Sequence, residues 1–445
     1  MRPHELLDHC TALTAQLLRF EHPADQLVAR YVREHRALGP RERATLTETV
    51  YAILRRKTLF ETLAQSGSSP LARCLAILGF AGDQQTLQAA LSPAEAQWLP
   101  SSEQIANLAH SHPACQHNLP AWLAESLQAQ LGDQFDAAAA ALLQAAPLDV
   151  RVNTLLAKRD AVLKTLAQQG IDAHATPYSP WGIRLPGKPH LGRLDLFRQG
   201  HIEVQDEGSQ LLALLLDAKR NEVVVDFCAG AGGKTLALGA AMRNTGRLYA
   251  FDVSAHRLEQ LKPRLARSGL GNVYPMAIAD ETDARIQRLA GKVDRVLVDA
   301  PCSGLGTLRR NPDVKWRQLP RHISAFADTQ AAILRRAARL LKPGGRLVYA
   351  TCSLLPAENE AVAMQFSAEQ KGAFTPLNAA QILQSCKVKN AMQLCTPAEA
   401  AATATAAIAA MADSAADSAA GQFLRLWPHV HGTDGFFAAV WQKRS

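Results

Sequence analysis

Between residues 205 and 365, short apolar segments alternate with longer segments of helical periodicity. Short runs rich in Val, Leu, Ile and Tyr are typical of buried strands, and the stretches between them are long enough for crossover helices. Five strands are expected, in "EVVVDFC", "RLYAFDV", "NVYPMAI", "DRVLVDAP" and "GRLVYATC". Strands connected in this way run parallel, and such a sheet binds its ligands at the carboxyl ends of the strands. The sequence therefore predicts an α/β domain around a parallel sheet.

The rest of the chain predicts further domains, because 445 residues are many for a single one. Residues 1–140 have helical patterns and no convincing strand, so we expect an all-helical domain there. Residues 145–200 combine extended segments with one helix, which indicates a small α+β unit. The α/β domain then spans 201–445 and contains an Ala/Ser-rich insertion of low complexity at 397–422. The closing segment "FLRLWPHVHGTDGFFAAVWQK" predicts a hairpin.

Composition favours a cytoplasmic protein with a large core. Apolar residues make up 48% of the chain, yet there is no uncharged apolar run long enough for a membrane span, and the start "MRPHELLDHC" lacks a signal segment. Eight cysteines include no C-x-x-C pair and no Cys/His cluster with zinc spacing, so free thiols and no metal are expected. The net charge of +8 is compatible with a nucleic-acid partner.

The segment "VVVDFCAGAGGKT" predicts a strand, a glycine-rich turn and a helix, an arrangement typical of a cofactor site. An ATP-binding loop would need glycine where the chain has Cys228, and a dinucleotide fingerprint would need a different glycine spacing. S-adenosylmethionine fits better, since it carries an amino-acid tail and a ribose but no phosphate. Its ribose hydroxyls call for an acid at the end of the next strand, where Asp252 lies.

Two more acids follow strands in the same way. Asp280 comes after the third strand and is placed to bind an adenine amino group, and Asp299 comes after the fourth. Any one of these acids is also explained as a helix N-cap, a position that aspartate favours. Their recurrence at successive strand ends is a more specific indication of a cofactor site than the glycines alone.

Two cysteines follow strands as well, Cys302 after the fourth and Cys352 after the fifth. Methylation of cytosine carbon 5 requires a thiolate that adds to carbon 6, because carbon 5 is otherwise a poor nucleophile. It also needs a carboxylate that stabilises charge on the ring and a base that removes the carbon-5 proton. Asp299, Cys302 and Cys352 supply this set on two strands that we expect to be adjacent.

The segments "DAPCSGLGTLRRNPDVKW" and "YATCSLLPAENE" resemble the Nop/Sun family of RNA (cytosine-5) methyltransferases. The N-terminal helices are similar to the NusB-like domain of the bacterial small-subunit ribosomal RNA methyltransferase B group. The resemblance implies a Rossmann-like class I methyltransferase domain with S-adenosylmethionine as cofactor, Cys352 as nucleophile, and Cys302 assisting release of the methylated base. The family's turn Cys-Ala-Ala-Pro-Gly-Gly-Lys is "CAGAGGK" here, without the proline that stiffens it.

The resemblance also implies which residues bind the cofactor. They are Cys228, Ala229, Gly230, Ala231, Gly232, Gly233, Lys234, Asp252, Arg257, Asp280 and Asp299. It implies RNA contacts at Arg151 and Asn153, and the basic loop after Cys302 adds Arg309, Arg310 and Lys315. Trp316 in that loop is placed to stack on a base or to pack in a core.

Three functions are compatible with these features. The leading hypothesis is a monomeric, S-adenosylmethionine-dependent enzyme that methylates cytosine carbon 5 in ribosomal RNA, without a membrane partner. A second keeps the chemistry and changes the substrate to transfer RNA. A third is an RNA-binding ribosome assembly factor that has lost catalysis, although the intact Asp299, Cys302 and Cys352 speak against it.

Overall fold

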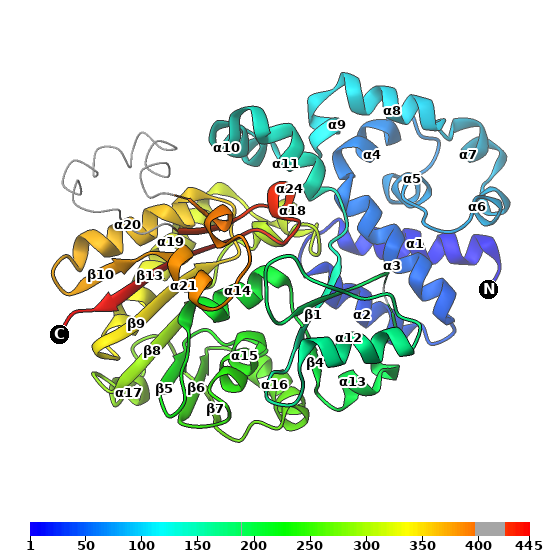
Figure 1. Cartoon of the computed structure of the whole chain (residues 1–445). Helices are drawn as coiled ribbons and strands as arrows, with labels where there is room; N and C mark the ends of the chain where they lie inside the picture. Colours follow the sequence, from blue (N-terminus) through cyan, green and yellow to red (C-terminus); the bar gives the residue numbers. More distant parts are fainter. Residues whose placement is uncertain (188, 397–422) are drawn as a thin grey trace. The chain divides into compact units, whose positions relative to one another are not determined.

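The computed structural model describes residues 1–187, 189–396 and 423–445, and Figure 1 shows its ribbon. It divides into two compact units, one of residues 1–145 with 307–319 and one of residues 146–306 with 320–445. The boundaries expected from the sequence, 1–140, 145–200 and 201–445, stay predictions. The Ala/Ser-rich insertion expected at 397–422 lies outside the described residues.

The first unit is helical, as expected for the N-terminal region. Its helices bury apolar residues spaced three or four apart, such as Leu6, Cys10, Leu13 and Leu17 on the first helix. Its helices are α1 (Pro3–Leu17), α2 (Ala24–Glu34), α3 (Pro40–Arg55), α4 (Lys57–Ala64), α5 (Leu71–Leu78), α6 (Gln84–Ala90), α7 (Pro93–Trp98), α8 (Ser102–Ser111), α9 (Pro113–His117), α10 (Ala121–Leu131), η1 (Gly132–Gln134), α11 (Phe135–Leu142) and α18 (Val314–Arg317).

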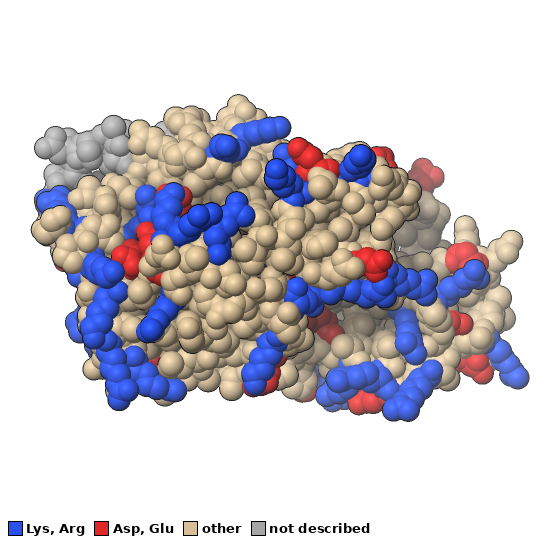
Figure 2. Space-filling model, turned by 60° about the horizontal axis from the view of Figure 1, so that its bottom comes forward, with Lys and Arg blue, Asp and Glu red and all other residues tan. Residues whose placement is uncertain are grey.

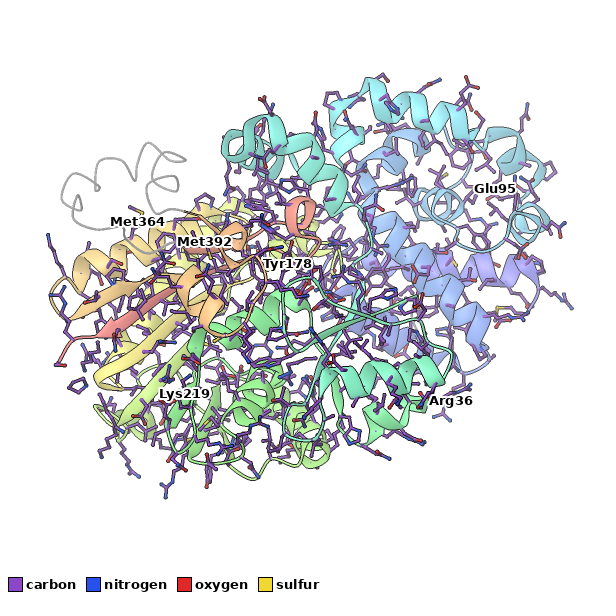
Figure 3. The ribbon with its side chains drawn as sticks, viewed as in Figure 1. Arg36, Glu95, Tyr178, Lys219, Met364 and Met392 are labelled. Atoms are coloured by element: carbon purple, nitrogen blue, oxygen red, sulfur yellow. The ribbon has the colours of Figure 1, made fainter. Side chains whose placement is uncertain are left out.

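Polar side chains cap the starts of α6, α7 and α8. Ser92 and Glu95 form a reciprocal capping box at the start of α7. Glu95, labelled in Figure 3, also accepts a hydrogen bond of 2.9 Å from Arg73 Nε. The hydrogen bond from Arg73 lowers the pKa of Glu95 to about 2, so this carboxylate stays ionised.

Residues 307–319 belong to the helical unit although they follow the fourth strand of the sheet in sequence. The carboxylate of Asp313 accepts a hydrogen bond of 3.2 Å from the amide of Ala24, the first residue of α2. The indole nitrogen of Trp316 donates to the carbonyl of Leu54 in α3 over 2.7 Å. These contacts make the basic segment part of a helical core.

The second unit begins with a small antiparallel sheet in the strand order β2-β3-β1-β4. Its elements are β1 (Leu148–Val152), α12 (Arg159–Gln168), β2 (His174–Ala175), β3 (Gly182–Leu185), η2 (Leu191–Arg193), α13 (Asp195–Arg198) and β4 (Ile202–Val204). Val150, Val152, Ile183 and Ile202 form its core with Leu166 of α12. The combination of strands and helices agrees with the α+β character expected here.

The large sheet has the strand order β11-β12-β13-β9-β8-β5-β6-β7, and β10 pairs with β13. Its strands are β5 (Val223–Asp226), β6 (Arg247–Asp252), β7 (Val273–Ala277), β8 (Val293–Asp299), β9 (Leu341–Thr351), β10 (Phe374–Leu377), β11 (Cys395–Thr396), β12 (Phe423–Leu426) and β13 (Phe436–Lys443). The five expected strands are β5 to β9, and neighbours among them run parallel. The expected C-terminal hairpin is the antiparallel pair β12 and β13, with the short helix α24 (Pro428–His431) between them.

Helices cover both faces of this sheet, which is why its strands are apolar on both sides (Figure 1). Consecutive residues of β5 show the alternation, since Val224 packs into one core and Val225 into the other. The first core includes residues of α14 (Glu207–Leu216), α15 (Gly233–Ala241), α16 (Ala255–Ser268) and α21 (Ala379–Ser385). The second includes residues of α17 (Ala284–Gln287), α19 (Pro320–Ala338) and α20 (Glu360–Glu369). The result is a Rossmann-like doubly wound domain.

Candidate active site

The turn between β5 and α15 requires its glycines. Gly230 and Gly232 have φ angles of 55° and 82°, a region that favours glycine. A Cβ atom on Gly232 would lie 2.2 Å from a methyl carbon of Leu261, so a larger residue does not fit. The amide of Gly230 donates to Asp252 Oδ2 over 2.8 Å, which fastens the turn to the end of β6. Backbone thus passes close to the strand ends where a ligand would bind.

The acids that follow the strands differ in their surroundings. Asp252 is buried, and its other oxygen accepts the amide of Ser254 at 2.8 Å, while Arg257 approaches it to 3.6 Å. Asp280 is exposed, and its carboxylate is held by hydrogen bonds from the amide and hydroxyl of Thr282, which lower its pKa. Asp252 is therefore fixed by the fold, whereas Asp280 is fixed only by its own turn.

Lys234 and Asp299 form an ion pair of 2.7 Å between the start of α15 and the end of β8. Burial opposes the charge on Lys234, but the charge of Asp299 and its hydrogen bond outweigh that effect and raise the pKa of Lys234. The lysine stays protonated beside a carboxylate that is still partly exposed. Asp299 is thus oriented by a neighbour on the glycine turn.

Asp226, the last residue of β5, is a candidate site residue that the sequence interpretation missed. Its Oδ2 accepts the hydroxyl of Thr235 at 2.7 Å, and its Oδ1 is buried without a hydrogen-bond partner among the described residues. Burial raises the pKa of Asp226 to about 7. The signal was present, because Asp226 ends the first strand as Asp252 ends the second.

These residues fit S-adenosylmethionine. The orphaned Oδ1 of Asp226 is suited to the ammonium group of an amino-acid tail, and the free amides at the start of α15 to its carboxylate. Asp252 lies at the end of the neighbouring strand, where a ribose is expected. Gly230 leaves room at its Cα, since a Cβ there would find no atom closer than 3.7 Å.

The two motif cysteines face each other across adjacent strand ends. β8 and β9 run parallel with Asp299 beside Ala350, and each is followed by a cysteine. The sulfur atoms of Cys302 and Cys352 are 3.3 Å apart, and both side chains are partly buried. The hydrogen bond to Cys352, followed by burial, raises the pKa of Cys302 well above its usual value. The contact with Cys352 thus favours the protonated form of Cys302.

Two expected RNA contacts are buried in the second unit, and the prediction is revised for both. Asn153 is 5% exposed, its amide group donates to the carbonyls of Gly200 and Ser268, and its oxygen accepts the amide of Leu155. Arg151 is 2% exposed, and burial lowers its pKa to about 10. Neither side chain is therefore accessible to an RNA backbone.

The same correction applies to Lys315 in the helical unit. This lysine is 2% exposed, and its ammonium donates to the carbonyl of Arg55 over 3.0 Å. Burial, reinforced by the charge of Arg55, lowers the pKa of Lys315 to about 7. Arg309 and Arg310 are half-buried, and a guanidinium nitrogen of Arg309 donates to the carbonyl of Ala145. Lys315 serves packing, and only the two arginines remain candidates for RNA contact.

The described residues contain neither a membrane-spanning helix nor a cluster of metal ligands. None of their helices is both long and apolar enough to cross a membrane. No cluster of three or more His, Cys, Asp or Glu suited to a metal ion occurs among them.

The sheet order, the glycine turn and the acids at the strand ends define a class I methyltransferase. A sequence model described as 16S rRNA methyltransferase RsmB/F matches residues 213–442, just over half of the chain, and the chain belongs to this family. A second model, the ferredoxin-like domain of RsmF/B-like methyltransferases, matches residues 119–190. Membership confirms the resemblance seen in the motifs and the prediction of S-adenosylmethionine as cofactor.

Individual relatives agree with this assignment. A probable ribosomal RNA small subunit methyltransferase B from Synechocystis is 38% identical over 253 residues, which are 56% of each chain. A solved methyltransferase homolog from Pyrococcus horikoshii is 29% identical with a TM-score of 0.60, covering 74% of this chain and 97% of its own. The solved protein PH0851 is 24% identical with a TM-score of 0.75, covering 100% of this chain and 99% of its own, and supports the fold.

The chain spans less than two thirds of the curated relatives it matches. The matched shares of the first three relatives are 56%, 59% and 59% of their lengths. The activity of these relatives is therefore only proposed for this chain.

Proposed function

We propose that this chain is an S-adenosylmethionine-dependent methyltransferase that acts on carbon 5 of a cytosine in small-subunit ribosomal RNA. The observation that carries the proposal is the pair of sulfur atoms 3.3 Å apart, at the ends of neighbouring strands beside the Lys234–Asp299 ion pair. One thiol beside a carboxylate would suit many reactions. Two facing thiols suit a reaction in which a covalent bond to the substrate is first made and later broken.

Cys352 is the nucleophile in this proposal. Its thiolate adds to carbon 6 of the cytosine, and the electron pair of the 5,6 double bond moves toward carbon 5 and the ring nitrogen. Asp299, held by Lys234, hydrogen-bonds the ring edge where charge develops. The cofactor supplies the methyl group that carbon 5 takes up.

Cys302 completes the reaction. Its pKa is raised chiefly by the hydrogen bond with the sulfur of Cys352, and that bond is lost once Cys352 is bonded to carbon 6. Cys302 then releases its proton to solvent more readily and accepts the proton of carbon 5. The electron pair of that C–H bond restores the 5,6 double bond, and the pair of the S–C bond returns to Cys352.

The substrate class rests on the relatives and on charge. The curated relatives are named as small-subunit ribosomal RNA methyltransferases. Many lysine and arginine side chains, with acids among them, occupy the face of the molecule in Figure 2, in keeping with the net charge of +8. Arg309 and Arg310 are our candidates for contacts to the RNA backbone.

A methyl-transfer assay tests the proposal. The protein is incubated with S-adenosylmethionine labelled in its methyl group and with unmodified small-subunit ribosomal RNA, and bulk transfer RNA serves as the competing substrate. We expect label in 5-methylcytidine after nuclease digestion of the ribosomal RNA only. Label in transfer RNA, in another nucleoside, or in neither RNA would contradict the proposal.

A further inference from the structure

Each of the two cysteines is followed by a buried serine, and both serines bind one carboxylate. Ser303 and Ser353 are 2% and 0% exposed. The amide of Ser303 donates to Glu358 Oε1 over 2.7 Å, and its hydroxyl donates to Oε2 over 2.6 Å. The hydroxyl of Ser353 donates to the same Oε2 over 2.5 Å. The carboxylate of Glu358 therefore bridges the loop of Cys302 and the loop of Cys352. The two loops also meet directly, since the hydroxyl of Ser303 donates to that of Ser353 over 3.2 Å and the amide of Gly306 donates to the carbonyl of Cys352 over 2.8 Å.

Glu358 lies in the turn η4 (Pro356–Glu358) and is 0% exposed. A buried carboxylate is costly unless donors satisfy it. Besides the two serines, Gln330 of α19 donates to Oε1 over 3.2 Å, and the same amide nitrogen donates to the carbonyl of Pro301 over 3.0 Å. Gln330 thus links Glu358 to the loop of Cys302 a second time, through Pro301, which precedes the cysteine.

The backbone of Glu358 and its carboxylate have different hydrogen-bond partners. The hydroxyl of Tyr349 donates to the carbonyl of Glu358 over 2.5 Å, and that bond anchors the turn itself. The donors to the carboxylate come from Ser303, Ser353 and Gln330, which lie outside this turn. A carboxylate placed only to hold its own turn would not need donors from both cysteine loops.

We infer that Glu358 is a positioning residue that sets the distance between the two sulfur atoms. It acts through Ser303 and Ser353 and does not touch the substrate. The inference rests on the proposed function, because the cysteine spacing matters only if both thiols take part in the reaction. Glutamine has nearly the same shape but offers one acceptor oxygen and a donor group in place of two acceptors, so Glu358→Gln should loosen the link without opening a cavity.

The kinetic test compares Glu358→Gln with Glu360→Gln in the full chain. Glu360 is also a buried carboxylate, 5% exposed, but it pairs with Arg425 at 3.6 Å. We expect Glu358→Gln to lower kcat by about tenfold to a hundredfold, because small misplacements of reacting groups have effects of that size. Its KM values for cofactor and RNA, and the activity of Glu360→Gln per folded molecule, should stay within about twofold of wild type.

A geometric test works without any RNA. Diamide takes up the two hydrogens of a facing thiol pair and is reduced to a hydrazine, while the sulfurs join as a disulfide. We expect rapid formation of the Cys302–Cys352 disulfide in the wild type and in Glu360→Gln, and at least about fivefold slower formation in Glu358→Gln. Peptide mass mapping identifies the pair, and circular dichroism confirms that each variant is folded.

Three outcomes would overturn the inference. These are an unchanged rate of disulfide formation in folded Glu358→Gln, a loss of activity that appears only in KM, or a kcat loss that the Glu360→Gln control shares. If the wild type transfers no methyl group, the proposed function fails, whereas the diamide comparison still decides whether Glu358 holds the sulfurs.

Discussion

Residues 297–306 and 307–319 follow each other in the chain and in one motif, yet they belong to different compact units. The first segment ends β8, carries Asp299 and Cys302, and places its polar groups in a network around the strand ends. The second is rich in arginine and lysine and packs against α2 and α3 through Asp313, Lys315 and Trp316. One segment builds a candidate reaction site, and the other uses its charged residues to build a core.

The difference teaches that residue type alone does not tell which surface a segment faces. A lysine can bury its long carbon chain and leave its nitrogen on a backbone carbonyl, as Lys315 does on Arg55. A carboxylate can cap a helix, as Asp313 does on the amide of Ala24. Variants in residues 297–306 should therefore affect the reaction, and variants in residues 307–319 should affect stability.

The largest effects on methyl transfer are expected at Cys302 in the first segment and at Cys352, which follows the neighbouring strand β9. Cys352→Ala should reduce methyl transfer at least about 10³-fold, because no thiolate is left to add to the base. Cys302→Ala should also stop turnover, but after the covalent bond has formed, since the carbon-5 proton then has no acceptor. A denaturing gel of protein mixed with RNA and cofactor should show a slowly migrating protein–RNA species only for Cys302→Ala.

A third cysteine supplies the control for these variants. Cys386 is half-buried, and its sulfur lies 3.5 Å from the carbonyl of Leu214. Cys386→Ala should keep its activity within about twofold of wild type. A covalent species trapped by Cys352→Ala instead of Cys302→Ala would exchange the two roles that we propose.

The sequence predicts the sheet well, because its signal is local. Apolar runs such as "VVVDF" and "RVLVD" mark β5 and β8 directly, and the helical stretches between the strands indicate that the strands run parallel. The close approach of Cys302 and Cys352 follows from the same argument, since neighbouring parallel strands end side by side. Glu358 could not be found in this way, because its proposed role depends on Ser303, which lies 55 residues earlier and follows the neighbouring strand β8, as well as on the nearby Ser353.

The burial of Arg151, Asn153 and Lys315 also escaped the sequence interpretation. Each stands in a segment whose pattern is equally compatible with a solvated or a covered position. The partner carbonyls of Asn153 and Lys315, on Ser268 and Arg55, lie far away in sequence. Only tertiary structure decides such cases. The family resemblance suggested RNA contacts at Arg151 and Asn153, and the basic character of the loop after Cys302 suggested one at Lys315.

The next prediction concerns Trp316 in the second segment. Trp316→Ala should lower the free energy of unfolding of the helical unit by about 3 kcal/mol, because it removes a packed ring and an indole hydrogen bond. Trp316→Phe keeps most of the packing and loses only the bond to Leu54, so about 1 kcal/mol is expected. Faster hydrogen–deuterium exchange in peptides from α2 and α3 locates the effect. A stable Trp316→Ala protein with weakened RNA binding would instead favour base stacking.

The smallest effect is expected from the charge of Lys315, and it depends on pH. The pKa of Lys315 is lowered to about 7 by burial, so the unfolded chain binds a proton more tightly than the folded one. The free energy of unfolding should therefore rise with pH between 7 and the ordinary lysine pKa, and below pH 7 this group should add no further slope. Lys315→Met, of similar length but uncharged, should be more stable than wild type at pH 6, and its advantage should shrink by about 2–3 kcal/mol between pH 6 and pH 9. Lys262→Met supplies the control, because the side chain of Lys262 is 65% exposed and should show no such convergence. If the Lys315→Met and wild-type curves of stability against pH stay parallel, Lys315 is solvated, and it joins Arg309 and Arg310 again as a candidate RNA contact.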